Sequence, residues 1–163
     1  MKALTIWQPW ASLIMVGAKP YEFRGRSYLA YVNHPQPGER IVIHAGARKM
    51  VVGEIADLLN KLGDPDGDCT GLVREPAYGV LHRIWNQPRC AFQMLPLGAG
   101  LGTAIIGKPC NAAMIFGAQI DGLPQDSDRG EFNWAWPLSE IAAFESPIPA
   151  RGRQGFWQWT AAT

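Results

Sequence analysis

The chain has 163 residues, of which 47% are hydrophobic and 18% are charged, and its formal net charge is +1. That much apolar surface is enough to bury the core of one domain, which excludes a chain that is disordered throughout. No stretch approaches the roughly 18 apolar residues of a membrane-spanning helix, so we expect a soluble protein with no membrane partner.

The first third of the chain alternates short elements with turns. Residues 2–7 have the pattern of a strand. Pro9 then opens a helix that Gly17 ends, because proline suits the start of a helix and glycine suits the position just after it. Residues 21–24 alternate apolar with charged side chains, which is typical of a half-exposed strand. Two further strands, separated by a proline-rich loop, are expected at residues 28–32 and 40–45.

The middle of the chain is helical and the rest is mostly β. Apolar side chains at helical spacing predict helices over residues 50–62 and 77–85. After these, Gly98, Gly100 and Gly102 occupy alternate positions of a long strand, which permits close backbone approach or bending, as at a barrel corner. The expected strands of this part are residues 92–106, 112–120, 132–136 and 155–159. The predicted class is α+β, mainly β.

Cysteines and glycines exclude several kinds of site. Cys69, Cys90 and Cys110 have neither the spacing of a zinc site nor the even number of a disulfide framework. Reduced thiols in a cytoplasmic protein are the simplest account. The glycines near position 100 lack the remainder of a dinucleotide or phosphate-loop fingerprint. We therefore expect neither a metal nor a cofactor.

The charges are unevenly distributed along the chain. Residues 19–49 carry six basic and two acidic side chains, whereas residues 121–145 carry six acidic side chains and only Arg129 as a base. A nearly neutral chain can thus present a local positive field to an anion. Solvated surface is the alternative account of both runs.

Lys19, Glu22 and Arg24 form the most informative cluster. An ammonium group is a good partner for phosphate, and a guanidinium group offers a planar fork for paired hydrogen bonds. Glu22 can orient Arg24, accept hydrogen bonds from the exocyclic amine of a base, or act as a general base. On a strand Glu22 and Arg24 share a face, while Lys19 has the opposite parity unless the preceding turn brings it back. The alternative is a surface ion pair beside a solvated lysine.

Three segments together resemble the ASCH family, a branch of the PUA-like β-barrel superfamily. Residues 4–14 look like the family's opening strand and QPWA helix, and residues 17–24 match its GxKxxExR signature at all four fixed positions. Residues 149–157 are similar to the strand that closes these barrels. The resemblance implies one domain, residues 1–163, with a PUA-like β-barrel and peripheral helices. Residues 46–91 match poorly and look like a helical insertion.

The resemblance also implies a ligand. PUA-like barrels bind RNA in a cleft beside the barrel, and the GxKxxExR segment is expected to line it. The expected partner is thus RNA, another nucleic acid or a nucleoside, bound by Lys19, Glu22 and Arg24. Side chains that can extend this surface are Trp7, Gln8, Arg26, Arg48, Lys49, Arg151 and Arg153.

Aromatic side chains supply a second kind of contact, because exposed rings stack on unpaired bases. Most of the seven tryptophans are expected in the core. Trp7, with Trp134 or Trp136, is a better candidate for stacking. For the two arginines near the C-terminus, a solvated loop is the alternative to a phosphate contact.

Two other function classes stay open. Some small ASCH members resemble amidohydrolases that act on N4-acetylcytidine, and ribonuclease activity is also proposed in the family. An enzyme of either kind would use Lys19, Glu22 and His44, although Glu22 stands where those amidohydrolases carry a threonine. His44 can equally be a hydrogen-bonded structural residue. The last alternative is a protein-interaction module that uses the acidic residues 121–145.

Overall fold

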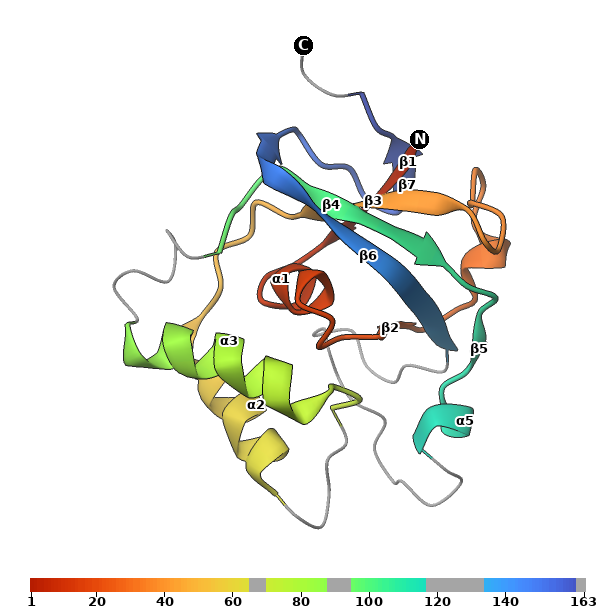
Figure 1. Ribbon diagram of the computed structural model, residues 1–163. Helices are drawn as coiled ribbons and strands as arrows, with labels where there is room; N and C mark the ends of the chain where they lie inside the picture. Colours follow the sequence, from red (N-terminus) through yellow and green to blue (C-terminus); the bar gives the residue numbers. More distant parts are fainter. Residues whose placement is uncertain (65–69, 88–94, 117–133, 161–163) are drawn as a thin grey trace.

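A strongly curved mixed sheet with helices packed beside it forms the domain in this computed structural model (Figure 1). The structure describes residues 1–64, 70–87, 95–116 and 134–160. The strands are β1 (Lys2–Ile6), β2 (Tyr21–Arg24), β3 (Arg40–Ala45), β4 (Ala99–Ile106), β5 (Cys110–Asn111), β6 (Trp134–Pro149) and β7 (Phe156–Gln158). The helices are α1 (Trp10–Met15), α2 (Val52–Gly63), α3 (Arg74–Asn86) and α5 (Ala113–Phe116), with a 3₁₀ turn, η1, at Tyr28–Ala30. The predicted α+β, mainly β class is confirmed.

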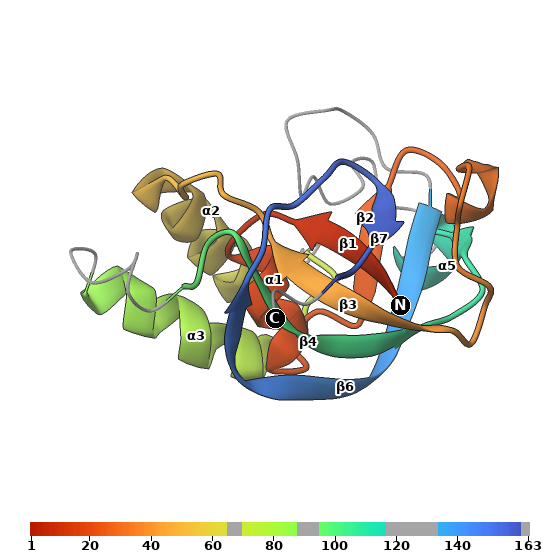
Figure 2. The ribbon, with the colours of Figure 1, turned by 90° about the horizontal axis from the view of Figure 1, so that it is seen from above.

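The strand order is β2-β6-β4-β3-β1-β7, and β5 adds to β6. Strands β1 and β3 pair in parallel, whereas the other pairs are antiparallel. Figure 2 shows β6 sweeping round the molecule, so that one strand serves both halves of the curved sheet. No pairing joins the edge strands β2 and β7 in the described residues. The barrel is therefore open on that side.

Glycines let β4 and β6 approach each other where the sheet bends. A Cβ atom on Gly102 would lie 2.4 Å from the backbone oxygen of Ala142, so no larger residue fits there. At Gly100 the missing side chain leaves room for the ring of Trp159, which would lie 2.5 Å from a Cβ atom. The close approach expected at these alternate glycines is thus present.

Helix α1 fills the concave side of the sheet, where it packs against β3, β4 and β6 (Figure 2). Leu13 and Ile14 are fully buried, as their spacing predicts. Gly17 follows the helix with a positive φ of 74°, a conformation that glycine adopts without strain. The backbone N–H groups of both Ala18 and Lys19 then donate to the Leu13 carbonyl. This turn fixes where Lys19 enters the interior.

Helices α2 and α3 pack on each other to one side of the sheet (Figure 1). They lie where helices were expected, and their inner faces build a second apolar cluster with Leu13 and Ala18. The members from α2 and α3 are Ile55, Leu58, Leu62, Ala77, Leu81 and Ile84. That this pair is an insertion into an ASCH domain stays a prediction. No described helix is long and apolar enough to cross a membrane.

Two predicted strands are wrong. Residues 28–32 begin with η1 instead, because the Ser27 side chain caps the turn by accepting from the Leu29 N–H. Tyr28 and Tyr31 are three residues apart, and side chains at that spacing share one side of a 3₁₀ turn. Both rings therefore pack against Trp136, which an alternating strand would not allow.

The second error concerns residues 112–120. Ala113–Phe116 forms the short helix α5, because the Asn111 side chain accepts from the Ala113 N–H and starts a turn. Residues 117–120 lie outside the described part of the chain, as do Cys69 and Cys90. Cys110 is a free thiol.

Candidate functional site

A cavity of about 560 Å³ lies between the two open edges of the sheet. Its walls come from β1, β2, β3, β6 and β7 and from residues 150–155, which link β6 to β7. The aromatic side chains that line it are Trp7, Trp10, Tyr31, Trp136 and Phe156. The charged side chains that line it are Glu22, Arg24, Arg151 and Arg153. Both ends of the chain thus contribute to one hollow.

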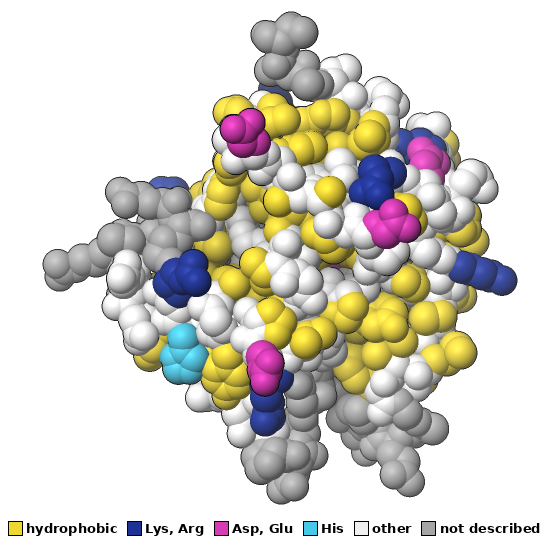
Figure 3. Space-filling view, viewed as in Figure 1, with side chains coloured by type: hydrophobic (Ala, Val, Ile, Leu, Met, Phe, Trp, Pro, Cys, Tyr) yellow, Lys and Arg dark blue, Asp and Glu magenta, His cyan; other side chains and the backbone are white. Residues whose placement is uncertain are grey.

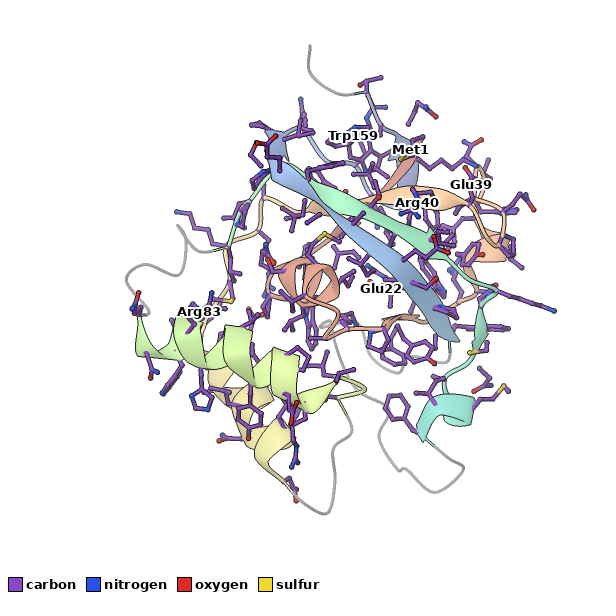
Figure 4. The ribbon with its side chains drawn as sticks, in the orientation of Figure 1. Met1, Glu22, Glu39, Arg40, Arg83 and Trp159 are labelled. Carbon is purple, nitrogen blue, oxygen red and sulfur yellow. The ribbon has the colours of Figure 1, made fainter. Side chains whose placement is uncertain are left out.

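The structure brings Lys19, Glu22 and Arg24 together, although not all of them face the cavity. Glu22 is 1% exposed and lies within the curve of the sheet (Figure 4). Its Oε1 accepts from Arg24 Nη2 at 2.5 Å, and its Oε2 is 3.6 Å from Lys19 Nζ. Glu22 and Arg24 line the cavity, whereas Lys19 does not. Arg24, with a third of its side chain exposed, is the cation of this group that faces the cavity.

Lys19 is enclosed behind the carboxylate. Its side chain is 0% exposed, and Nζ lies 4.8 Å from the ring centroid of Trp10 and 5.1 Å from that of Phe23. Ring faces attract a cation, so the two rings and Glu22 together compensate for the lost hydration. Glu22 Oε2 has no hydrogen-bond donor among the described residues, and the ammonium ion is its close charge partner.

His44 holds the segment between β6 and β7. The ring is fully buried, and its Nε2 lies 3.0 Å from the backbone oxygen of Ala150. Because a carbonyl oxygen only accepts, Nε2 carries the proton. Burial lowers the pKa of His44 below its ordinary value of 6.5, so the ring is neutral at pH 7. A Cβ atom on Gly152 would lie 2.5 Å from Cε1 of the ring, so the segment lies directly against the histidine.

Arg151 and Arg153 project from that segment and line the cavity. Both are exposed, and neither has an ion pair or hydrogen bond with another residue in the described part of the chain. Their guanidinium groups are thus available to an anion.

The remaining predicted site residues lie at the margin of the cavity or outside it. Trp7 lines the cavity, and the Arg48 guanidinium covers its ring at 4.5 Å while pairing with Glu54 at 2.6 Å. The Gln8 amide is buried and bonds to the backbone at both ends, donating to Pro96 and accepting from Ser12. Besides Lys19, the predicted residues that do not line the cavity are Gln8, Arg26, Arg48 and Lys49.

Sequence reasoning missed three of the cavity's aromatic side chains. Trp10 lies in the predicted helix that Pro9 opens, Tyr31 in the strand expected at residues 28–32, and Phe156 in the strand expected at residues 155–159, and none of the three is a predicted site residue. The spacing of Tyr28 and Tyr31 was the available signal for a tight turn that puts both rings inside. Of the two alternatives named for stacking, Trp136 lines the cavity and Trp134 does not. Trp136 stacks on Phe156 with ring centroids 5.7 Å apart.

The surface outside the cavity offers no comparable cluster of cations in the view of Figure 3. Basic and acidic side chains lie there singly or in opposite-charge pairs. Residues 121–133, most of the acidic segment, lie outside the described residues, and Glu140 pairs with Arg40 at 3.0 Å. Among the described residues, no group of three or more histidine, cysteine, aspartate or glutamate side chains is placed to hold a metal ion.

Comparisons with known proteins find similarity to solved structures but no matching family. No protein-family model matches the sequence, and no curated protein matches it either. A solved structure described as the crystal structure of ASCH from Zymomonas mobilis is similar, with 15% sequence identity and a TM-score of 0.44. The likeness covers 91% of this chain and 72% of that one. The family proposed below therefore depends on the sequence motifs, not on this likeness.

Proposed function

We propose that the chain is an ASCH domain that binds RNA or another nucleic acid in the cavity between β2 and β7. The observation that carries this proposal is the lining of the cavity. Three guanidinium groups and one carboxylate border it, together with five aromatic rings. Phosphates attract guanidinium groups, and bases stack on aromatic rings.

The balance of charge favours an anion. Glu22 is the one carboxylate that the described residues contribute to the lining. Lys19 and Arg24 already pair with it, so the three groups together carry a net charge of +1. Glu22 thereby acts as a positioning residue that holds the Arg24 fork towards the cavity. Arg151 and Arg153 add two further cations. A phosphodiester and its base match this combination better than an uncharged nucleoside does.

The same contacts favour binding over hydrolysis. Lys19 lies behind Glu22 instead of in the cavity, and each Glu22 oxygen faces a cation. The Nε2 atom of His44 is bonded to Ala150. A general acid or base must reach the reacting proton. Lys19 is enclosed and both Glu22 oxygens face cations, whereas His44 lines the cavity and its Nδ1 atom has no hydrogen-bond partner among the described residues. Amidohydrolase and ribonuclease activity are therefore outcomes to test, not the leading proposal.

Binding can be tested by fluorescence anisotropy with labelled single-stranded RNA. We expect the affinity of the wild-type protein to fall steeply with salt, because each phosphate contact releases counterions. Arg24→Gln should weaken binding about tenfold or more, since it removes a charge-assisted contact. Arg83→Gln is the matched control. It removes the same charge from α3, away from the cavity (Figure 4), and should leave the affinity unchanged.

Chemical denaturation of Arg24→Gln must show that it is folded at the temperature of the binding assay. The proposal would be contradicted if the affinity changed neither with the salt concentration nor in the Arg24→Gln variant. Consumption of N4-acetylcytidine or cleavage of the RNA would replace it with an enzyme. If neither binding nor turnover is found, a partner captured through residues 121–145 would support the interaction-module alternative.

A further inference from the structure

A second cavity, of about 310 Å³, lies on the other side of the segment that follows β6. It is lined by Pro149, Ala150, Arg151, Arg153, Trp157, Gln158 and Thr160. Ala150, Arg151 and Arg153 border both cavities. We infer that the ligand is an oligonucleotide strand that crosses this segment, with one nucleotide in each cavity and the linking phosphate on the two arginines. This inference rests on the proposed function.

The geometry of β7 explains why the two cavities flank one strand. Successive side chains of a strand point to opposite faces. Phe156 accordingly lines the first cavity and Trp157 the second. A ligand in either cavity thus meets an aromatic side chain of β7, and the segment that bears Arg151 and Arg153 lies between the two positions.

The segment that separates the two cavities is held in place by two hydrogen bonds of Ala150 and by a close contact of Gly152. The Ala150 N–H donates to the Gly98 carbonyl at 2.9 Å, and the Ala150 carbonyl accepts from His44 at 3.0 Å. Gly152 lies against the His44 ring. Arg151 and Arg153 therefore start from an ordered backbone, which reduces the entropy lost when their side chains bind a phosphate.

The second cavity can accept a nucleotide, but few of its side chains can bind a free mononucleotide selectively. Trp157 supplies a ring whose Nε1 donates to Thr5 Oγ1, so the ring is fixed before a ligand arrives. Gln158 and Thr160 add polar side chains. Among the described residues, the charged side chains that line it are the two arginines shared with the first cavity. One ligand can occupy both cavities only if a phosphodiester joins two of its units, so the substrate class that we infer is an oligonucleotide and not a mononucleotide.

Ligand length provides the test. The probes are the four 5′-mononucleotides and single-stranded hexanucleotides of the same bases, measured by calorimetry with the whole chain. We expect the best hexanucleotide to bind about tenfold or more tightly than its mononucleotide, because the second contact is intramolecular. Thr160→Trp should fill the second cavity and remove most of this gain, so that the hexanucleotide affinity falls towards that of the mononucleotide. Asn60→Trp is the control, since it adds an exposed ring on α2, which lines neither cavity.

The arginines give a second readout. The Arg151→Gln/Arg153→Gln variant should lower the slope of log affinity against log salt by roughly 0.7 for the hexanucleotide, because both arginines bind the one linking phosphate. If mononucleotide and hexanucleotide bind equally well, or Thr160→Trp weakens both alike, the inference is wrong while the proposed function stands. Absence of binding by every probe would overturn both.

Discussion

At the level of single residues, Lys19 sets the strongest constraint on the site, because its ammonium group is removed from water. Its close opposite charge is Glu22, which also neutralises part of the charge of Arg24. A buried ion pair of this kind adds little net stability, since the attraction mainly offsets the cost of dehydration. Removal of one partner is costly, however, because it leaves the other charge buried.

A double-mutant cycle on Lys19 and Glu22 tests this account. We expect Lys19→Met and Glu22→Gln each to lower the free energy of unfolding by about 3 kcal/mol, the low end for a broken buried pair because Arg24 remains. The double variant should lose at least about 1 kcal/mol less than the sum, because neither charge is then left alone. Urea denaturation measures all four proteins.

The exposed pair of Arg40 and Glu140 provides the control for this cycle. Glu140 is 67% exposed, so Glu140→Gln should cost less than about 1 kcal/mol. Strictly additive effects at Lys19 and Glu22 would mean that the two charges do not interact.

At the level of elements, the approach of β4 to β6 depends on Gly102 more than on Gly100. The space beside Gly102 is occupied by the backbone of β6, whereas the space beside Gly100 is occupied by the side chain of Trp159, near the C-terminal end of the described chain. Backbone atoms in a paired strand move only if the sheet deforms, while a side chain can rotate.

The glycine-to-alanine substitutions should therefore differ in cost. We expect Gly102→Ala to destabilise the domain by about 3 kcal/mol or more, and Gly100→Ala by clearly less, on the order of 1 kcal/mol. Thermal and chemical denaturation of the two variants make the comparison, with the exposed Gly53 of α2 as a control position without a contact. Equal losses at Gly100 and Gly102 would show that the distance to the β6 backbone does not set the cost.

The 3₁₀ turn η1 depends on a buried hydroxyl group. Tyr28 donates to the Gly107 carbonyl at 2.9 Å, and burial, together with the charge of Glu39, raises the pKa of Tyr28 to about 12. We expect Tyr28→Phe to cost about 1 to 2 kcal/mol at pH 8, because the carbonyl loses its donor. Above pH 10 the unfolded state loses its tyrosine proton first, so wild-type stability falls with pH and the difference from the variant narrows. Denaturation at pH 8 and pH 11 measures this, and a constant difference would contradict it.

Local patterns predicted the helices that packing buries. They missed η1 and α5, which a capping contact starts, and residues 137–149 of β6. The apolar spacing of α1, α2 and α3 marks the faces that the structure buries. By contrast, residues 28–32 carry the composition of a strand, and the Ser27 cap turns them into η1. No local pattern shows that Tyr31 then reaches a cavity wall built by strands far away in the sequence.

At the level of the whole molecule, the cavity joins segments that the sequence keeps far apart. Glu22 and Arg24 on β2 share it with Phe156 on β7 and with residues 150–155. The sequence motifs predicted that these segments matter, and the signature residues indeed come together. Strand parity left open which cation faces the cavity. The turn after α1 decides it by placing Lys19 behind Glu22, and such a turn depends on hydrogen bonds that composition does not reveal.

The pH dependence of folding should report on His44, which links the sheet to the segment between the cavities. Burial lowers its pKa below 6.5, so the folded protein binds this proton less readily than the unfolded chain does. The stability that the neutral ring contributes is complete above about pH 6.5 and is lost as the pH falls towards the lowered pKa. We therefore expect the wild-type free energy of unfolding to decrease between pH 7.5 and pH 5.5.

The variant His44→Gln can still donate to the Ala150 carbonyl but cannot take up a proton. It should be less stable than the wild type at pH 7.5 because of its poorer fit, and its stability should change less between the two pH values. His82→Gln, on the exposed side of α3, serves as the control and should retain the wild-type pH dependence. Urea denaturation of the three proteins at both pH values measures the difference. An unchanged slope in His44→Gln would mean that this ring is not the group whose protonation loosens the segment between the two cavities.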